Sequence, residues 1–376
     1  YALTTKMAKD ADEVISFLAE LTAKAKPIAQ QEKAGLTKFA TETGGPEKLQ
    51  AWDLAYYSEK LREQNFSFSV EEVREYFVAD TVMEGLFEIV TRLFGVAARA
   101  ASPPSAWHDD VGFYELLDET HEVIGAFYTD LYARQGKRGG AWMDTCLDRR
   151  LRNNKLELPV AYLTCNFTPP LAKQPSLLTH DEVETLFHEF GHCLHHLLTM
   201  VNQPEVGGIN GVAWDAVELP SQFLEHWCWQ RESLNLIAKH HQSGEPIPDD
   251  LVVKMRSAKT FQSGLQTLLQ IELALFDMQI HTSYDAFGSD SVQNILDTIR
   301  SEVAVLPTPD FNRFQNSFSH IFAGGYAAGY YSYKWAEVLS SDAFSRFEEE
   351  GIFNRDTGAD FRKIILARGG SEDATD

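Results

Sequence analysis

Cysteine is scarce in this chain of 376 residues, which contains four, at positions 146, 165, 193 and 228. No two of them form a CxxC pair, so the sequence predicts neither a disulfide framework nor a zinc ribbon. Thiols used so sparingly are typical of a reducing compartment, and we expect a cytoplasmic protein.

Long apolar runs and positive charge are also in short supply. The longest apolar stretch, at 86–101, is interrupted by Glu88, Arg92 and Arg99, so no membrane-spanning segment is expected. The chain has 33 Lys and Arg residues against 55 Asp and Glu residues, a net charge of −22. Such a charge repels phosphate backbones and anionic lipids, which argues against nucleic acid and membranes as partners.

Apolar residues are plentiful by comparison. The sequence is 44% hydrophobic and 12% aromatic, which is enough apolar surface to offset the entropy of ordering a chain of this length. We therefore expect a globular protein with a large core.

Periodicity divides the chain into three segments. Residues 1–100 are predicted to be helical, with apolar positions three and four apart and a run at 80–94 that ends at Gly95. Residues 101–170 are richer in strand signals, at 112–118, 123–132 and 160–167, and the first two runs resemble a hairpin. Residues 171–376 are predicted to be mostly helical again. The pattern indicates a mainly α protein with a small β-sheet.

The most informative segment is THDEVETLFHEFGHCLHH at 179–196. Thr179 and Glu182 have the spacing of a capping box, so a helix is expected to begin here. At about 100° per residue, the apolar side chains gather on one face and His188 and His192 lie on the opposite face. The predicted helix therefore buries one side and presents two imidazoles on the other.

His188 and His192 form an HExxH pattern with Glu189. Histidines at i and i+4 can each give a nitrogen to one zinc ion, while Glu189 is placed to reach a water beside the metal rather than the metal itself. The alternative is a pair of polar histidines with no ligand. His192 and His196 are also four apart, but Cys193 then replaces the glutamate; we expect His195 and His196 to support the site from outside or to be solvated.

A third ligand is expected from a later segment, WDAVELPS at 214–221. Pro220 fits the first turn of a new helix, which places Glu218 at the entrance of that helix. Glu218 and Glu225 share a face at helical spacing, so Glu225 is a candidate to orient a ligating imidazole. An ordinary surface acid is the alternative for Glu225.

The segment SHIFAGGYAAGYYSYKW at 319–335 combines glycine and alanine with several tyrosines. Taken alone, it favours an aromatic helix face. Beside a hydrolytic centre, however, phenol hydroxyls such as those of Tyr326, Tyr330 and Tyr333 could stabilise an oxyanion, and His320 could act similarly.

Three blocks, at 187–196, 214–229 and 320–335, occur in the order found in the M3 family of zinc metallopeptidases, the thimet oligopeptidase and neurolysin family. The whole chain resembles this family's catalytic half. The resemblance implies a gluzincin-type zincin domain of the neurolysin-like fold and one zinc ion held by His188, His192 and Glu218.

The family's other roles carry over by the same resemblance. Glu189 matches its general base, Tyr326 and Tyr333 match tyrosines that hold substrate or stabilise the oxyanion, and Tyr330 matches a third tyrosine of the same segment. His320 matches a substrate-binding histidine, although its spacing to Tyr326 is one residue longer than in mammalian members. Gly324 and Gly325 belong to the same substrate-binding segment.

The implied function is metalloendopeptidase cleavage of short oligopeptides by a water that Glu189 activates at the zinc, in a monomer. An extended substrate would pair with an edge strand, for which 141–144 and 160–167 are the candidates. The alternatives are a dipeptidyl carboxypeptidase of the same family and a catalytically impaired zinc- and peptide-binding fragment. Because family members are nearly twice as long, we expect a fragment that lacks a preceding helical domain and the extreme C-terminus.

Overall fold

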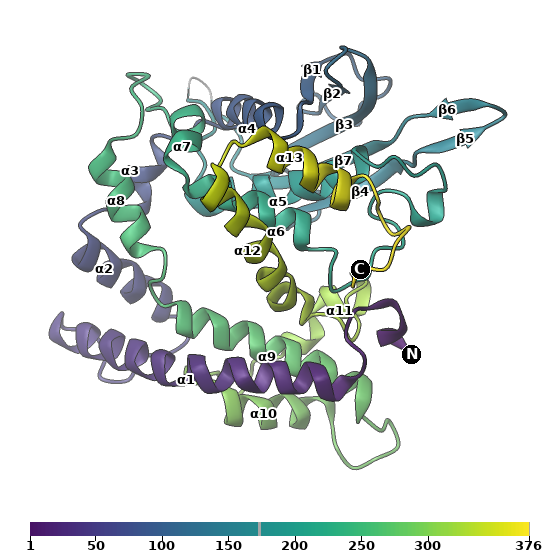
Figure 1. Cartoon of the computed structure of the whole chain (residues 1–376). Coiled ribbons are helices and arrows are strands. Elements are labelled where there is room, and N and C mark those ends of the chain that lie inside the picture. Colours follow the sequence, from purple (N-terminus) through teal and green to yellow (C-terminus); the bar gives the residue numbers. More distant parts are fainter. Residues whose placement is uncertain (172–173, 376) are drawn as a thin grey trace. The chain divides into compact units, whose positions relative to one another are not determined.

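The computed structural model describes residues 1–171 and 174–375 and is mainly helical with a small mixed sheet (Figure 1). Contacts between Cα atoms divide the chain into two compact units. The helical unit comprises Tyr1–Ser69 and Val253–Trp335, and the sheet unit comprises Val70–Val252 and Ala336–Asp376. Both units are therefore assembled from segments that are distant in the sequence.

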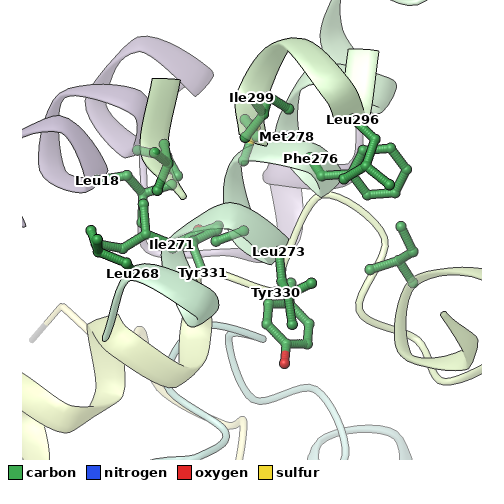
Figure 2. Close-up of a cluster of buried hydrophobic side chains, with 14 of the residues drawn as sticks. Leu18, Leu268, Ile271, Leu273, Phe276, Met278, Leu296, Ile299, Tyr330 and Tyr331 are labelled. Atoms are coloured by element: carbon green, nitrogen blue, oxygen red, sulfur yellow. The ribbon is translucent and has the colours of Figure 1, made fainter. Parts of the chain in front are cut away.

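The helical unit is built around two long helices, α1 (Ala11–Glu42) and α9 (Ser263–Thr282), which pack against each other. Asp10 caps α1 by accepting a hydrogen bond from the backbone N–H of Glu13. Apolar side chains of both helices form a common core with α10 (Figure 2). The remaining elements of this unit are η1 (Ala2–Thr5), α2 (Leu54–Phe66), α10 (Val292–Val303), η4 (Phe314–Asn316) and α11 (Ser319–Ala323).

The sheet unit contains a five-stranded sheet in the order β1-β2-β3-β7-β4, in which β3 and β7 are parallel and the other pairs antiparallel. Its strands are β1 (Ala97–Ala100), β2 (Gly112–Leu117), β3 (Val123–Tyr132), β4 (Trp142–Leu147) and β7 (Val160–Phe167). A separate pair consists of β5 (Arg150–Arg152) and β6 (Lys155–Glu157).

Helices complete the sheet unit, and α5 contacts strands β3, β7 and β4. The helices are α3 (Val70–Arg74), α4 (Ala79–Phe94), α5 (His180–Leu197), η2 (Pro204–Val206), α6 (Leu219–Glu225), η3 (His226–Trp229), α7 (Arg231–Ile237), α13 (Arg355–Phe361) and η5 (Arg362–Leu366). Two more, α8 (Asp249–Ala258) and α12 (Ser332–Glu350), contain the points where the division between the units falls.

Several local predictions are confirmed. Gly95 ends α4 in the left-handed conformation, with a φ of 67°. Strands β2 and β3 form the expected antiparallel hairpin. The first strand begins at Ala97, slightly before the predicted β-rich segment. It was not predicted because its sequence AARA has the composition of a helix.

The run at 160–167 is a strand, as predicted, but its assignment to an edge of the sheet is wrong. The run at 160–167 was a candidate edge strand, but β7 lies between β3 and β4 and is hydrogen-bonded on both sides. The two edge strands of this sheet are β1 and β4, and β4 includes most of the other candidate, 141–144.

Among residues 1–171 and 174–375, no helix combines the length and the apolarity needed to cross a membrane.

A buried ion cluster ties β3 to the loop that follows it. Asp130 is 4% exposed and accepts hydrogen bonds from Arg134 at 2.6 Å, Lys137 at 2.8 Å and the indole of Trp107 at 2.8 Å. Burial alone would raise the pKa of Asp130, but these hydrogen bonds outweigh it and hold the pKa well below its usual range. The cluster therefore stabilises the fold above the unfolded-state pKa of about 4, and this contribution is lost as the pH falls.

Asp130→Asn is expected to lower the free energy of unfolding at pH 7 by about 3–5 kcal/mol, because it leaves the buried ammonium of Lys137 without its carboxylate. Urea titration at pH 7 and pH 3 measures the effect, and the difference from wild type should shrink at pH 3. Asp144→Asn, at an exposed carboxylate on β4, is the control. A loss that is the same at both pH values would contradict this account.

Candidate metal centre

Helix α5 begins where the capping box predicts. The hydroxyl of Thr179 accepts a hydrogen bond from the backbone N–H of Glu182, and the carboxylate of Glu182 accepts one from the N–H of Thr179. This reciprocal cap fixes the first turn of α5. Its apolar side packs on the sheet, and Val183, Leu186, Phe187 and Phe190 are fully buried.

His188, His192 and Glu218 come together in the sheet unit. One carboxylate oxygen of Glu218 lies 3.2 Å from Nε2 of His188 and 3.1 Å from Nε2 of His192. A ligand atom from each residue lies within 4.8 Å of the other two. Glu218 is fully buried, and Nδ1 of His192 is buried without a hydrogen-bond partner among the described residues.

The donor set fits zinc. Two imidazole nitrogens and a carboxylate oxygen are common ligands of catalytic zinc, and ligands at about 2.1 Å around a tetrahedral ion lie roughly 3.4 Å from one another. The observed separations of 3.1 and 3.2 Å are close to that value. The cluster can therefore hold one ion with little rearrangement and leave a position for a water or substrate.

Glu218 reaches the histidines because α6 packs closely on α5. Glu218 is the N-cap of α6, and Pro220 lies in the first turn as predicted. A Cβ atom at Gly191 would lie 2.5 Å from the carbonyl oxygen of Pro220 and 2.6 Å from the Cα of Ser221. Only glycine at position 191 permits this approach.

Gly191→Ala is expected to destabilise the fold by about 1–3 kcal/mol and to weaken metal binding, because the added methyl group must push α6, and Glu218 with it, away from the histidines. Thermal unfolding and zinc titration against a competing chelator measure the two effects.

Gly35→Ala is the matched control. Gly35 also lies inside a helix, α1, but a Cβ atom there would have no neighbour within 4 Å. It should instead stabilise the chain by about 0.5–1 kcal/mol through helix propensity. If both variants changed the stability of the fold in the same direction, steric contact at Gly191 would not be the cause of the loss in Gly191→Ala.

Glu225 contacts the cluster from outside. Its carboxylate lies 2.6 Å from Nδ1 of His188, the ring nitrogen opposite the one that faces Glu218. Burial alone would lower the pKa of His188, but hydrogen bonds with Glu218 and Glu225 outweigh it and raise the pKa well above its usual value. A carboxylate at Nδ1 fixes the ring so that Nε2 faces the ligand position, which favours the orienting role over an ordinary surface acid.

Glu189 is 7% exposed and lies on the same helix as the two histidines. Burial raises the pKa of its carboxyl group, whereas His188, His192 and a hydrogen bond from the backbone of Met143 oppose the shift. Met143 belongs to β4, so this contact joins the helix to the edge strand. A carboxylate whose pKa is raised in this way is a stronger base than an exposed one, which suits general-base work.

His195 and His196 lie outside the cluster. Neither is solvated, since they are 2% and 1% exposed, which excludes one of the two expectations. Nε2 of His196 contacts the carbonyl oxygen of Leu147 at 3.0 Å. Burial lowers the pKa of His195 to about 3, so this ring is neutral.

A second group, His180, Asp181 and Glu184, also has its ligand atoms close together near the start of α5. Two of its members already have other partners: Nε2 of His180 faces the carbonyl oxygen of Cys228, and Glu184 accepts a hydrogen bond from Trp229. Asp181 is exposed. This group is a weaker metal candidate than the buried cluster of His188, His192 and Glu218.

The predicted tyrosines gather in the helical unit. Tyr326 stacks on Tyr333 at 5.2 Å between ring centroids, and Tyr330 lies 5.1 Å from Tyr333. His320 in α11 is 5.6 Å from Tyr330 and 6.0 Å from Tyr326. Only Tyr333 lies on α12, so these rings form a cluster around a turn rather than one face of a helix.

Gly324 and Gly325 have backbone reasons to be glycine. Gly325 has a φ of 88°, and a Cβ at Gly324 would lie 2.9 Å from the carbonyl oxygen of His320. Their expected part in substrate binding stays a prediction.

Comparisons with known proteins agree with the motifs. The profile of peptidase family M3 matches residues 1–376. Oligopeptidase A of Escherichia coli (strain K12) is 52% identical over 376 residues, which are 100% of this chain and 55% of that protein. Dipeptidyl carboxypeptidase of the same organism is 36% identical over 99% of this chain and 55% of its own length. The chain thus spans about half the length of these relatives.

Among solved structures, one titled "PZ peptidase A with inhibitor 2" aligns with 98% of this chain and 64% of its own, with a TM-score of 0.49 and 16% identity. The family profile matches the whole chain, and the chain is 52% and 36% identical to the two curated relatives named above. Together these matches establish the family. The chain belongs to peptidase family M3.

Proposed function

We propose that this chain forms the catalytic half of a zinc-dependent metalloendopeptidase that hydrolyses short oligopeptides. The observation that carries the proposal is the cluster of His188, His192 and Glu218, with Glu189 buried beside it. The relatives called oligopeptidase A support the substrate class.

Zinc, when bound by the three ligands, supplies a Lewis acid that polarises a peptide carbonyl and makes water a better nucleophile. Glu189 takes a proton from the attacking water and later delivers it to the departing amine. Its raised pKa makes this carboxylate a stronger base than an ordinary exposed glutamate. Glu225 holds the ring of His188 so that Nε2 remains directed at the ligand position.

Roles for the substrate-contacting residues complete the proposal. The family resemblance assigns Tyr326 and Tyr333 to hydrogen bonds with the oxyanion or substrate, and His320 and Tyr330 to substrate binding. An extended peptide would pair with the free edge of β4, the strand that contributes the Met143 contact to Glu189. We also propose a cytoplasmic monomer; the thiols of the four cysteines agree with a reducing compartment.

A fluorogenic oligopeptide tests the proposal. Cleavage that is lost in a chelator and restored by about one equivalent of zinc supports it. A chain that holds zinc and binds the peptide without cutting it would instead be a binding fragment. The second candidate is a dipeptidyl carboxypeptidase, the name of one relative. To distinguish it from an endopeptidase, the peptide is also tested with an amidated C-terminus. An endopeptidase cleaves both forms.

A further inference from the structure

The tyrosine cluster depends on a turn with little regular structure of its own. This turn, residues 324–331, joins α11 to α12, and we call it the tyrosine turn. Gly325 and Ala328 both have positive φ values, 88° and 49°. A left-handed alanine is unfavourable by itself, so contacts from outside the turn must hold this conformation.

Asp277 of α9 provides those contacts. One of its carboxylate oxygens accepts a hydrogen bond from the N–H of Ala328, and the other accepts bonds from Gly329 and Tyr330, all at 2.8 Å. Nδ1 of His281 lies 2.9 Å from the first oxygen and is hydrogen-bonded to the backbone carbonyl oxygen of Asp277 at 2.8 Å. Three of the about four acceptor positions of the carboxylate are thus filled by backbone N–H groups of the turn, and the His281 imidazole lies beside it.

The position of Asp277 suits this task. Its side chain is fully buried on α9, and its charge is met by three successive backbone N–H groups. Gln270 lies two helical turns earlier on the same face of α9 and accepts a hydrogen bond from the hydroxyl of Tyr330 at 3.1 Å. Tyr330 is thus held at its backbone by Asp277 and at its hydroxyl by Gln270.

The anchor extends to the other rings of the cluster. The N–H of Gly329, bound by Asp277, also donates to the carbonyl oxygen of Tyr326 at 2.9 Å. Tyr326 in turn stacks on Tyr333, and Tyr330 packs against Tyr333. Moving the backbone at 328–330 therefore moves the rings that the proposed function places on the substrate.

We infer that Asp277 is a positioning residue for peptide hydrolysis, which acts by fixing the tyrosine turn so that Tyr326 and Tyr333 present their hydroxyls in one arrangement. This inference rests on the proposed function for its effect on catalysis. The anchoring itself is a property of the helical unit alone.

The test compares Asp277→Asn with Glu272→Gln. Both replace a buried carboxylate of α9 by its amide, but Glu272 pairs with Arg300 of α10, and no hydrogen bond or ion pair joins it to the turn among the described residues. Hydrogen exchange of the peptide containing 328–330 measures anchoring. Asp277→Asn should accelerate exchange at these amides by about 10–100-fold, because bonds to a charged acceptor are lost, whereas Glu272→Gln should leave them unchanged.

Kinetics measure the consequence for catalysis. Asp277→Asn should lower kcat for the fluorogenic peptide by about tenfold or more without changing zinc stoichiometry. In a Tyr333→Phe or Tyr326→Phe background the same substitution should lower kcat much less, because its effect on kcat acts through those hydroxyls. If Asp277→Asn does not fold, His281→Gln, which removes the imidazole 2.9 Å from the Asp277 carboxylate, should give a smaller change in the same directions.

Unchanged exchange at 328–330 in a folded Asp277→Asn protein would overturn the inference, and so would a kcat loss that is fully additive with both tyrosine variants. Equal effects from Glu272→Gln would also overturn it. Failure of the proposed function appears differently, as a wild-type chain that does not cleave the peptide although its 328–330 amides respond to Asp277→Asn as expected.

Discussion

Glu189→Gln is expected to lower kcat by about 10²–10⁴-fold while leaving one zinc ion per chain. Glutamine keeps the size of the side chain and the ability to accept the hydrogen bond from Met143, so the helix and the three ligands should be undisturbed. It cannot take a proton from water. The measurement is turnover of a fluorogenic oligopeptide, paired with zinc content by mass spectrometry of the folded protein.

Asp181→Asn on the same helix is the control, since Asp181 is exposed and lies outside the cluster of His188, His192 and Glu218. It should retain nearly wild-type turnover. The pH profile adds a second readout: the acidic limb of kcat/KM should disappear with Glu189, because the raised pKa of this carboxyl group belongs to the proposed base. A Glu189→Gln protein that cleaves at the wild-type rate would remove Glu189 from this role.

The parts of the metal centre that depend on local spacing were predictable from sequence. The capping box at Thr179 fixes where α5 begins, and the i, i+4 spacing of His188 and His192 then places both rings on one face. Glu218 was predictable as a helix entrance. Its distance from the histidines was not, because that distance depends on the close approach of α6 at Gly191, a contact between elements about 30 residues apart.

The order of the sheet lies beyond local pattern as well. Both edge-strand candidates have strand composition, and only pairing with distant residues separates them. A signal was nevertheless present: the run VAYLTCNF of β7 is mostly apolar, as expected of a central strand, whereas β4 carries the exposed Asp144.

The conformation of the tyrosine turn could not be predicted from the sequence either. Its glycines and tyrosines were visible, but glycine and alanine spacing favoured a helix face, and the anchor, Asp277, lies about 50 residues earlier in the chain. Asp277 is one of two acids in α9, with Glu272, and a buried carboxylate does not identify its donors. Long-range hydrogen bonds of this kind require the fold to be known.

Glu218→Gln is expected to abolish zinc binding at micromolar metal, and activity with it. Glu218 is fully buried and its oxygen faces both imidazoles, so an amide removes the charge that a divalent ion needs as well as the best oxygen donor. The Kd for zinc should rise by more than about 100-fold, because the loss of a group that only supports a ligand already lowers metal affinity by about 10–100-fold. Titration against a competing chelator measures this change.

Glu225→Gln provides the matched comparison, since it makes the same chemical change one step further from the metal. It should raise the Kd for zinc by only about 10–100-fold, because His188 keeps its ring but loses the carboxylate that fixes it. Excess zinc should then restore most of the activity of Glu225→Gln but none of that of Glu218→Gln. If the two variants lost zinc equally, Glu225 would be a ligand rather than an orienting group; if Glu218→Gln kept one zinc ion per chain, the third ligand would have to be sought elsewhere.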